Sequence, residues 1–412
     1  MSTNAGEAEQ PVRTGLISKA PLRDLPVEVG VLAAVAFFVA AGFGIVAPAI
    51  PVFARSFGVS RAAAAAVVSA FAFMRLASAL GVGRLVNRMG ERIVLGTGIG
   101  IVAVSSALAG FANDYTQLLI LRGAGGIGSA MFSVSASSLL LGVTTSGQRG
   151  RAMGSFSGGF LVGGIAGPGL GGLVTGWSLR APFFLYAGTL AAAGAVGLAL
   201  LPRRTAMEKD HAEQGKSPLT VLRALRLPTF QAAALANLAD NWASLGVRAA
   251  IVPLLVVEVL HRSPIWTGIG LTVFTVGNVG TLLLGSRQTD RRGRKPVLLA
   301  GCLGSALGCA MLIPHPSLPL FLAAMLVFGA GSGLLDVAPG AMLGDVVGGR
   351  GGTVVASFQM AGDVGSLVGP LAAGFLADTA GYGWAFGVTA AVLVLAAGFG
   401  ARAPESLVRA QT

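Results

Sequence analysis

Charged residues are scarce in this chain. Asp, Glu, Lys and Arg make up only 11% of its 412 residues, whereas a soluble domain carries about 25%. Hydrophobic residues make up 54% of the chain. So little charge cannot cover a water-facing surface. The composition therefore excludes an ordinary soluble protein and predicts an all-α integral membrane protein.

Cysteine and histidine are also scarce, which argues against two kinds of site. The two cysteines, Cys302 and Cys309, lie in one apolar run, and the three histidines are isolated in predicted loops. We therefore expect neither a disulfide framework nor a metal site. No paired catalytic acids and no nucleophile–base arrangement stand out, so we expect no enzyme activity and no bound cofactor.

The sequence predicts twelve membrane-spanning helices, because twelve apolar runs are bounded by charged and turn residues. The predicted spans are 28–53, 62–83, 93–113, 117–141, 152–176, 181–201, 229–257, 265–286, 296–314, 318–343, 353–377 and 383–401. A polar connection, with a short helix expected near 219–225, separates two sets of six. The predicted parts are an N-terminal tail (1–27), a six-helix half (28–201), a linker (202–228), a second six-helix half (229–401) and a C-terminal tail (402–412).

Basic residues outnumber acidic ones by 29 to 17, which gives a formal net charge of +12. Such a balance can indicate nucleic-acid binding, but here the basic residues follow the predicted topology. With the N-terminus in the cytoplasm, 22 Lys and Arg residues fall in inside segments and four in outside loops. This asymmetry agrees with the positive-inside rule. We therefore expect both termini in the cytoplasm, a surrounding lipid bilayer and no nucleic-acid partner.

The two predicted halves repeat each other at a spacing of 202 residues. The fifth span contains Ser155-Phe156, Gly163, Gly167-Pro168 and Gly172, and the eleventh contains Ser357-Phe358, Gly365, Gly369-Pro370 and Gly374. Gly44 and Pro51 of the first span recur in the same way as Gly246 and Pro253 of the seventh. A repeated six-helix unit predicts two pseudo-symmetric halves, an arrangement found in secondary transporters.

The fifth span is unusually rich in glycine. Each glycine inside a helix costs about 1 kcal/mol relative to alanine in water, but in a membrane small residues let helices approach closely. The pattern resembles the antiporter signature of the major facilitator superfamily, above all of its proton-coupled drug exporters. Close helix packing alone would also explain it, and we expect Gly163 and Gly167 to pack against the eighth span. The residues that carry the resemblance are Gly163, Gly167, Pro168, Gly171 and Gly172.

Two predicted loops resemble the cytoplasmic loop motif of the same superfamily, in which an acid and basic residues connect helix ends in one conformational state. The first loop has Asn87 in place of the usual Asp and Glu91 in place of a basic residue, so this connection is altered. The second loop is the closer match. The basic residues would also serve as positive-inside anchors. The motif residues are Asn87, Arg88 and Gly90 in the first loop, and Asp290, Arg291, Gly293 and Arg294 in the second.

Arg122 of the fourth span is followed by Gly126 and Gly128. This spacing resembles the Arg-x-x-x-Gly-x-Gly signature of the drug-exporting branch. The resemblance implies that Arg122 takes part in proton or substrate coupling and favours the ionised form of a nearby acid. The alternative is that a lone arginine extends along its helix toward the membrane surface.

Six charged residues fall inside predicted spans, where charge is costly and marks functional candidates. They are Arg75, Arg122, Asp240, Arg248, Asp336 and Asp363. The resemblance implies that spans one, four, seven and ten line a central cavity, where Asp240 and Asp336 would carry protons or cationic groups. The spacing of Asn237, Asp240 and Asn241 places them on one helix face, and with Trp242 they predict a recognition patch. The alternative is that these groups only connect helices through hydrogen bonds.

We predict an ion pair between Arg75 and Asp363 across the contact between the halves. The resemblance implies that the second span faces the eleventh. Each residue lies thirteen positions from a basic residue of a cytoplasmic loop, Arg88 or Arg350, so both lie roughly 20 Å deep. A pair offsets much of the cost of burying charge at that depth. The alternative is that each side chain contacts water or a backbone carbonyl separately.

The residues and the resemblance together predict a proton-coupled secondary transporter in the plasma membrane. It would be a monomer that exports small amphipathic molecules in exchange for protons by alternating access, driven by the proton gradient. Two alternatives stay open. One is a transporter that imports or exports a single polar metabolite, and the other is a membrane sensor built on a transporter fold.

Overall fold

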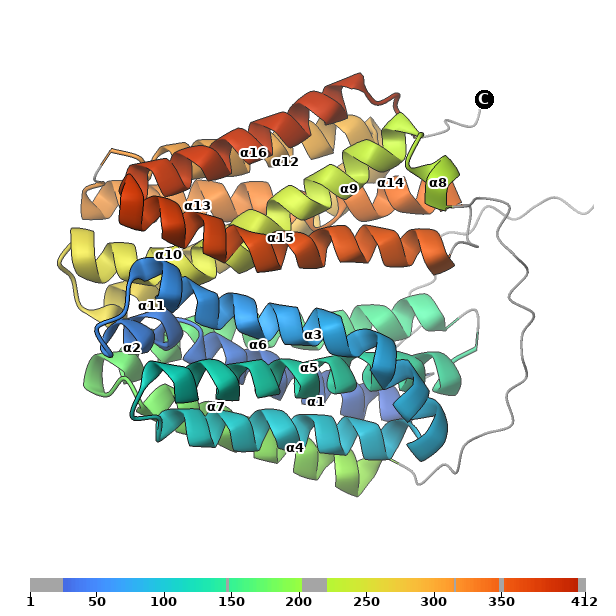
Figure 1. Cartoon of the computed structure of the whole chain (residues 1–412). Helices are drawn as coiled ribbons and strands as arrows, with labels where there is room; N and C mark the ends of the chain where they lie inside the picture. Colours follow the sequence, from blue (N-terminus) through green and yellow to red (C-terminus); the bar gives the residue numbers. More distant parts are fainter. Residues whose placement is uncertain (1–24, 146–147, 202–220, 315, 348–351, 407–412) are drawn as a thin grey trace, which may run out of the picture.

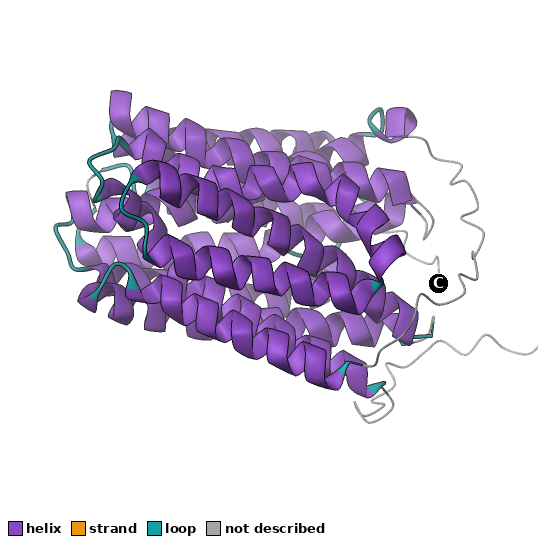
Figure 2. Cartoon of the chain, turned by 60° about the horizontal axis from the view of Figure 1, so that its bottom comes forward, coloured by secondary structure: helices purple, strands orange, loops and turns teal. Residues whose placement is uncertain are grey.

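The structure is a computed structural model that describes residues 25–145, 148–201, 221–314, 316–347 and 352–406. Over these ranges the chain forms a bundle of helices and contains no strand (Figures 1 and 2). Most of the predicted tails, 1–27 and 402–412, and of the predicted linker, 202–228, lies outside the described residues.

The N-terminal half contains the first six predicted spans. The first of them is broken between Val46 and Ala49, beside Pro48. Proline lacks a backbone donor and interrupts helical hydrogen bonding. The helices of this half are α1 (Val27–Val46), α2 (Ala49–Arg55), α3 (Arg61–Met89), α4 (Glu91–Gly110), α5 (Tyr115–Val143), α6 (Arg149–Trp177) and α7 (Ala181–Leu200).

The C-terminal half contains the other six spans, two of which are interrupted. The seventh consists of α9, η2, α10 and η3, in which η marks π-helical segments, and the tenth consists of α13 and α14. The short α8 (Val221–Ala224) lies where a linker helix is expected. The remaining bounds are α9 (Pro228–Asp240), η2 (Asn241–Val247), α10 (Arg248–Leu254), η3 (Leu255–Val259), α11 (Pro264–Arg292), α12 (Arg294–Ala310), α13 (Leu318–Leu335), α14 (Ala338–Val347), α15 (Gly352–Thr379) and α16 (Tyr382–Arg402).

All twelve predicted spans are present as helices. Eleven are long and apolar enough to cross a membrane. The remaining one, α12, has 17 residues, which correspond to about 26 Å of helix and lie at the short end of the range for a span. The fold is therefore the predicted all-α membrane bundle of two six-helix halves.

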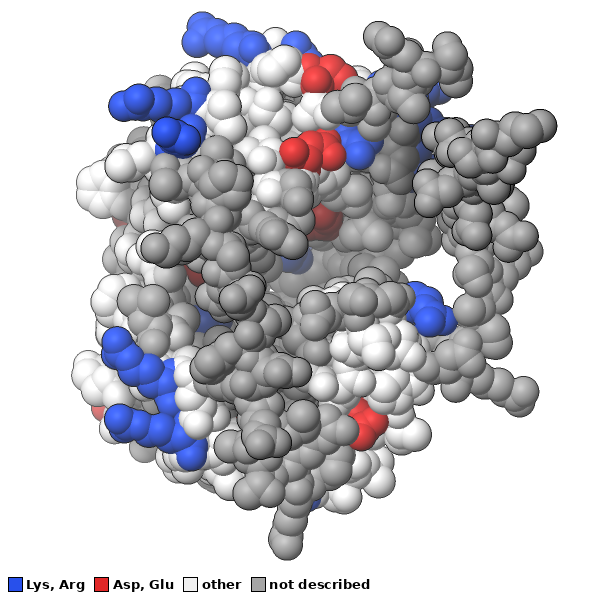
Figure 3. Space-filling model, turned by 90° about the vertical axis from the view of Figure 1, so that its right-hand side faces the viewer, with Lys and Arg blue, Asp and Glu red and all other residues white. Residues whose placement is uncertain are grey.

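The two ends of the bundle differ in how closely the halves approach each other. We call the end at which α1 begins and α16 finishes the terminal end, and the other the opposite end; the terminal end is on the right in Figure 1. The surface of the terminal end is hollowed between the two halves (Figure 3). At the opposite end, ion pairs connect the halves directly.

Gly163 and Gly167 pack against α1, so the prediction that they face the eighth span is wrong. A Cβ atom on Gly163 would lie 2.4 Å from the Phe37 carbonyl oxygen, and one on Gly167 would lie 2.5 Å from that of Ala41. The reason is helical geometry. Residues four apart lie on one face of α6, and that face is covered by α1 of the same half.

Gly172 approaches the eighth span more closely than Gly169 and Gly176, the other glycines of α6 that face it. A Cβ atom there would lie 2.6 Å from the Cα of Gly268 in α11. The repeat reproduces this contact, because a Cβ on Gly374 of α15 would lie 2.8 Å from the Cα of Ala62 in α3. The two halves therefore touch through a pair of related glycine contacts.

Candidate transport site

A buried acid lies where the seventh span changes its helix type. Asp240 ends α9 and is only 7% exposed. The Ser244 hydroxyl, one turn later in η2, donates to Asp240 Oδ1 over 3.1 Å. The same hydroxyl lies 2.9 Å from that of Ser332 in α13. Asp240 thus connects through two serines to the tenth span.

A second acid lies at the break in the tenth span. Asp336 follows the last residue of α13, and α14 begins two residues later at Ala338. The Asn278 side-chain amide of α11 donates to Asp336 Oδ2 over 2.7 Å. Asp336 is exposed, whereas Asp240 is buried. Both acids therefore lie at helix discontinuities, in two of the spans that the resemblance assigns to the cavity.

Arg248 brings a positive charge to the same cluster. Its Nε donates to the Ser244 carbonyl oxygen over 2.9 Å, and its guanidinium carbon lies 4.2 Å from the centre of the Phe274 ring. Ser244 therefore contacts Asp240 through its side chain and Arg248 through its backbone. A proton that binds or leaves Asp240 changes the charge balance of a small network that also reaches Ser332.

The structure divides the predicted recognition patch. The Asn237 amide donates to the Phe358 carbonyl oxygen of α15 over 2.8 Å, and the Asn241 amide donates back to the backbone oxygen of Asn237 over 2.8 Å. Trp242 Nε1 donates to Thr389 Oγ1 of α16 over 3.3 Å. Asn237 and Trp242 thus bond to other helices of the C-terminal half, and Asn241 also accepts from the Ser366 hydroxyl of α15 over 3.5 Å. Only Asp240 joins the acid cluster. The alternative interpretation, hydrogen bonding between helices, describes them.

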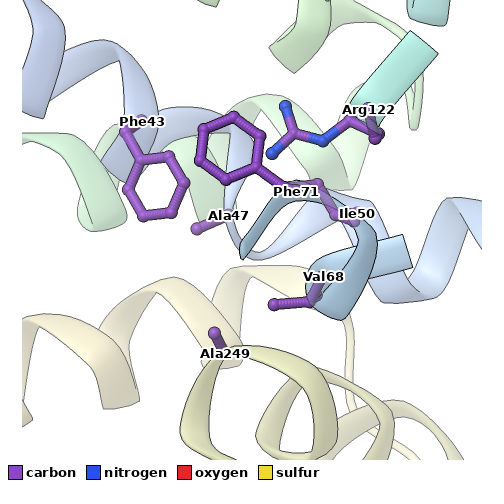
Figure 4. A pocket seen from close by; sticks show the side chains of 7 residues that line it. All are labelled: Phe43, Ala47, Ile50, Val68, Phe71, Arg122 and Ala249. Carbon is purple, nitrogen blue, oxygen red and sulfur yellow. The ribbon is translucent and has the colours of Figure 1, made fainter. Parts of the chain in front are cut away.

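Arg122 lies in the N-terminal half and is 2% exposed. Its guanidinium carbon is 4.8 Å from the centre of the Phe71 ring. Its Nε has no hydrogen-bond partner, and among the described residues no acid forms an ion pair with it. The side chain borders a cavity of about 30 Å³ whose lining includes Phe43 and Ala249 (Figure 4). The acid that the resemblance leads us to expect beside Arg122 is therefore not among its described contacts.

Arg75 and Asp363 meet across the contact between the halves, as their depths predict. Arg75 Nη2 of α3 donates to Asp363 Oδ1 of α15 over 2.5 Å. The side chains are 37% and 27% exposed, respectively. The contact is present, and its importance for function stays a prediction.

A larger polar cluster connects the halves at the opposite end. Glu258 of η3 accepts from Arg55 Nε, Arg61 Nε and the Tyr382 hydroxyl, each over 2.8 Å. Asp378 of α15 accepts from the backbone N–H groups of Arg61 and Ala62 over 2.9 and 2.8 Å. It thereby caps the N-terminus of α3, where the helix dipole favours a negative charge. In each of these ion pairs the N-terminal half supplies the arginine and the C-terminal half the acid.

The sequence model of the Major Facilitator Superfamily matches residues 32–246 and, separately, residues 233–409. The two matches cover most of the chain, one over each half. The chain belongs to the Major Facilitator Superfamily. It is therefore an integral membrane transporter of small molecules and not an enzyme.

Relatives within the superfamily include two proteins of Bacillus subtilis (strain 168). The chain is 26% identical to "Multidrug resistance protein 1" over 342 residues, which cover 82% of this chain and 86% of that protein. It is 28% identical to "Multidrug resistance protein 2" over 170 residues, which cover 41% of this chain and 42% of that protein, less than half of its length.

The fold is also similar to solved structures of the superfamily. One is the crystal structure of a bacterial homologue of the human lysosomal transporter Spinster, in an inward-facing and unoccupied conformation. Its TM-score is 0.72 and its sequence identity is 16%, over 91% of this chain and 95% of that one. At this identity the similarity concerns the fold alone.

The superfamily loop motifs lie at the terminal end. Gly90 and Gly293 have φ angles of 82° and 115°, which favour glycine, and they join α3 to α4 and α11 to α12. Arg294 Nε contacts Asp345 Oδ2 of α14 at 3.0 Å, and its backbone N–H donates to Glu405. The side chains of Asn87, Arg88 and Arg291 are exposed, and that of Asp290 lies outside the described part of the chain.

Several residues around the two acids were not among the candidates that the sequence predicted. Ser244 lies four residues after Asp240, and Ser332 lies four residues before Asp336. That spacing places each serine one helical turn from an acid, so the sequence could have indicated both serines as partners of the acids. Nothing local marks Asn278, because its partner lies on another helix.

Proposed function

We propose that the chain exports small amphipathic molecules in exchange for protons, by alternating access of its two halves. Asp240 and Asp336 carry the protons. The protein lies in the plasma membrane, with both termini in the cytoplasm. The names of the two Bacillus subtilis relatives support export of drug-like compounds. The distribution of Lys and Arg supports the orientation.

The observation that carries this proposal is the placement of both acids at helix discontinuities. Asp240 lies at the junction of α9 and η2, and Asp336 lies between α13 and α14. When Asp240 is ionised it accepts a hydrogen bond from Ser244, and when it is protonated it has a proton to donate. Proton binding therefore changes the contacts between the seventh and tenth spans at points where their helices are already interrupted.

The difference in how the halves approach each other at the two ends supports alternating access. The hollow at the terminal end opens the space between the halves to that side (Figure 3). The Glu258 cluster joins the halves at the opposite end. Rocking of the halves would close the hollow and separate this cluster, a motion that repeated halves support.

The test uses the purified protein in proteoliposomes with an imposed pH gradient. Uptake of ethidium, a cation, and of naphthoate, an anion, is measured with and without a protonophore. We expect the wild type to concentrate at least one probe and to lose this uptake when the gradient is collapsed. Asp240→Asn and Asp336→Asn should each lower gradient-driven uptake at least about tenfold, because an amide cannot carry the proton.

Probe exchange without a gradient should survive in the Asn variants, since it requires no proton movement. Glu28→Gln is the matched control, because Glu28 lies in the first turn of α1, away from both acids. We expect this control to behave like the wild type. Wild-type protein that concentrates neither probe, or Asn variants that still concentrate one under the gradient, would refute the proposal.

A further inference from the structure

Arg122 differs from Arg75 and Arg248, the other arginines within the predicted spans. Arg75 pairs with Asp363, and Arg248 lies in the network that contains Asp240. Arg122 is 2% exposed, yet its Nε has no hydrogen-bond partner and no acid pairs with it within the described ranges. A guanidinium buried in this way is costly unless an anion neutralises it.

The surroundings of Arg122 leave a place for such an anion. One face of the guanidinium is covered by the ring of Phe71, at 4.8 Å, and the group borders the cavity (Figure 4). The cavity measures about 30 Å³, which exceeds the roughly 10–15 Å³ that a cavity needs to hold one water molecule. It therefore admits a small terminal group of a larger molecule.

The other lining residues indicate what the rest of that molecule is like. Phe43, Ile50 and Val68 from the N-terminal half are apolar, and Ala249 comes from the C-terminal half. A ligand here would touch both halves, so its binding would respond to their movement. The lining favours an apolar, aromatic body, and the single guanidinium matches a single negative charge.

We infer that this cavity is a subsite for an amphipathic aromatic anion. The carboxylate of the anion binds Arg122, and its aromatic ring lies near Phe43 and Phe71. A carboxylate suits the site because its two oxygens match the planar donors of a guanidinium. The inference rests on the proposed transport function and names the class of substrate that the cavity beside Arg122 receives.

The test compares two probes that share one naphthyl body, one with a charged carboxylate and the other with a neutral amide. Binding of naphthoate and of naphthamide to the purified protein is measured by calorimetry in detergent, without a membrane or a gradient. We expect the wild type to bind naphthoate about tenfold more tightly or better, the ratio expected for one charge-assisted hydrogen bond. Equal affinity of the wild type for the two probes would overturn the inference, and this comparison needs no variant.

Variants then assign the preference to Arg122. Arg122→Gln should bind both probes equally, and Arg122→Lys should keep part of the preference because it keeps the charge. Arg180→Gln is the matched control, since Arg180 also lies over a phenylalanine ring, Phe53 at 5.8 Å, but does not line the cavity. Full preference in Arg122→Gln would refute the assignment.

This outcome is independent of proton coupling. If proteoliposomes concentrate ethidium under a pH gradient while the protein binds both naphthyl probes equally, only the carboxylate subsite is wrong. If the carboxylate preference depends on Arg122 but no probe is concentrated, the subsite stands and the proposed proton-coupled export is wrong.

Discussion

At the scale of single residues, the charged groups of the spans fall into three kinds of surroundings. Arg75 and Asp363 neutralise each other across the two halves, Asp240 lies among serines near Arg248, and Arg122 lies against an aromatic ring. The first kind can hold the halves together, the second can exchange a proton, and the third can receive an anion. The chemistry of each group follows from its neighbours more than from its depth.

The Arg75–Asp363 pair gives a prediction at this scale. Arg75→Ala and Asp363→Ala should each lower transport several-fold, because each leaves one charge unpaired inside the membrane. Exchanging the two residues should recover part of the loss, and a double-mutant cycle on initial uptake rates measures the coupling. Additive single effects with no recovery in the exchanged protein would show that the contact does not matter for transport.

How far the sequence predicted individual residues depended on where their partners lie. The Arg75–Asp363 contact was predictable because depth is counted along the chain and the repeat indicates which spans meet. The contacts of Asn237 and Trp242 were not, because helical spacing gives the angle between two side chains but not the helix that each one faces. The cavity beside Arg122 depends on residues from several spans, which no local pattern identifies.

At the scale of helices, glycine determines which elements can touch. On α6, Gly163 and Gly167 meet α1 within one half, and Gly172 meets α11 of the other half. One helix therefore has separate faces for packing within a half and for packing between halves. The sequence predicted close packing of this helix, and helical spacing places Gly172 on a different face from Gly163 and Gly167. Spacing does not tell which helix each face meets.

These faces predict different effects for the same substitution. Gly167→Ala should lower the melting temperature in detergent, because its Cβ would lie 2.5 Å from the Ala41 carbonyl oxygen. Gly172→Ala should instead mainly lower transport, because its Cβ would disturb the contact with Gly268 between the halves. Melting curves and uptake rates of both variants measure the difference.

Gly164→Ala is the control on the same helix, because nothing lies within 4 Å of its Cβ position. It should leave both melting and transport close to the wild type, since alanine is also the better helix former. A Gly172→Ala variant that transports as well as Gly164→Ala would show that the glycine contact between halves is not required.

At the scale of the whole molecule, the Glu258 cluster joins the halves at one end while the surface at the other end is hollowed. Arg55, Arg61 and Tyr382 all contact this one carboxylate. The sequence places these residues at span ends, where they look like ordinary loop charges. Their convergence depends on how the two halves dock, which the repeat alone does not give.

We predict that Glu258→Gln shifts the protein toward a state that is open at the opposite end, because it removes the charge that two arginines share. The distance between spin labels at Asn113→Cys and Arg262→Cys, one in each half, should lengthen in that variant. The native cysteines are buried, which limits background labelling. Tyr382→Phe removes one hydrogen bond and keeps the charge, so its shift should be smaller. Unchanged distances in Glu258→Gln would contradict this role of the cluster.

In each described ion pair between the halves, the N-terminal half supplies the arginine and the C-terminal half the acid. This asymmetry affects which halves can dock together. Gly172 and Gly374 lie 202 residues apart and each packs closely on the other half, so these contacts would suit two identical halves. The acids do not repeat: the positions 202 residues before Glu258, Asp363 and Asp378 hold Ser56, Leu161 and Gly176. A second N-terminal half docked in place of the C-terminal one would present no carboxylate to the arginines. Symmetric packing thus permits self-association of like halves, and asymmetric charge selects the unlike partner.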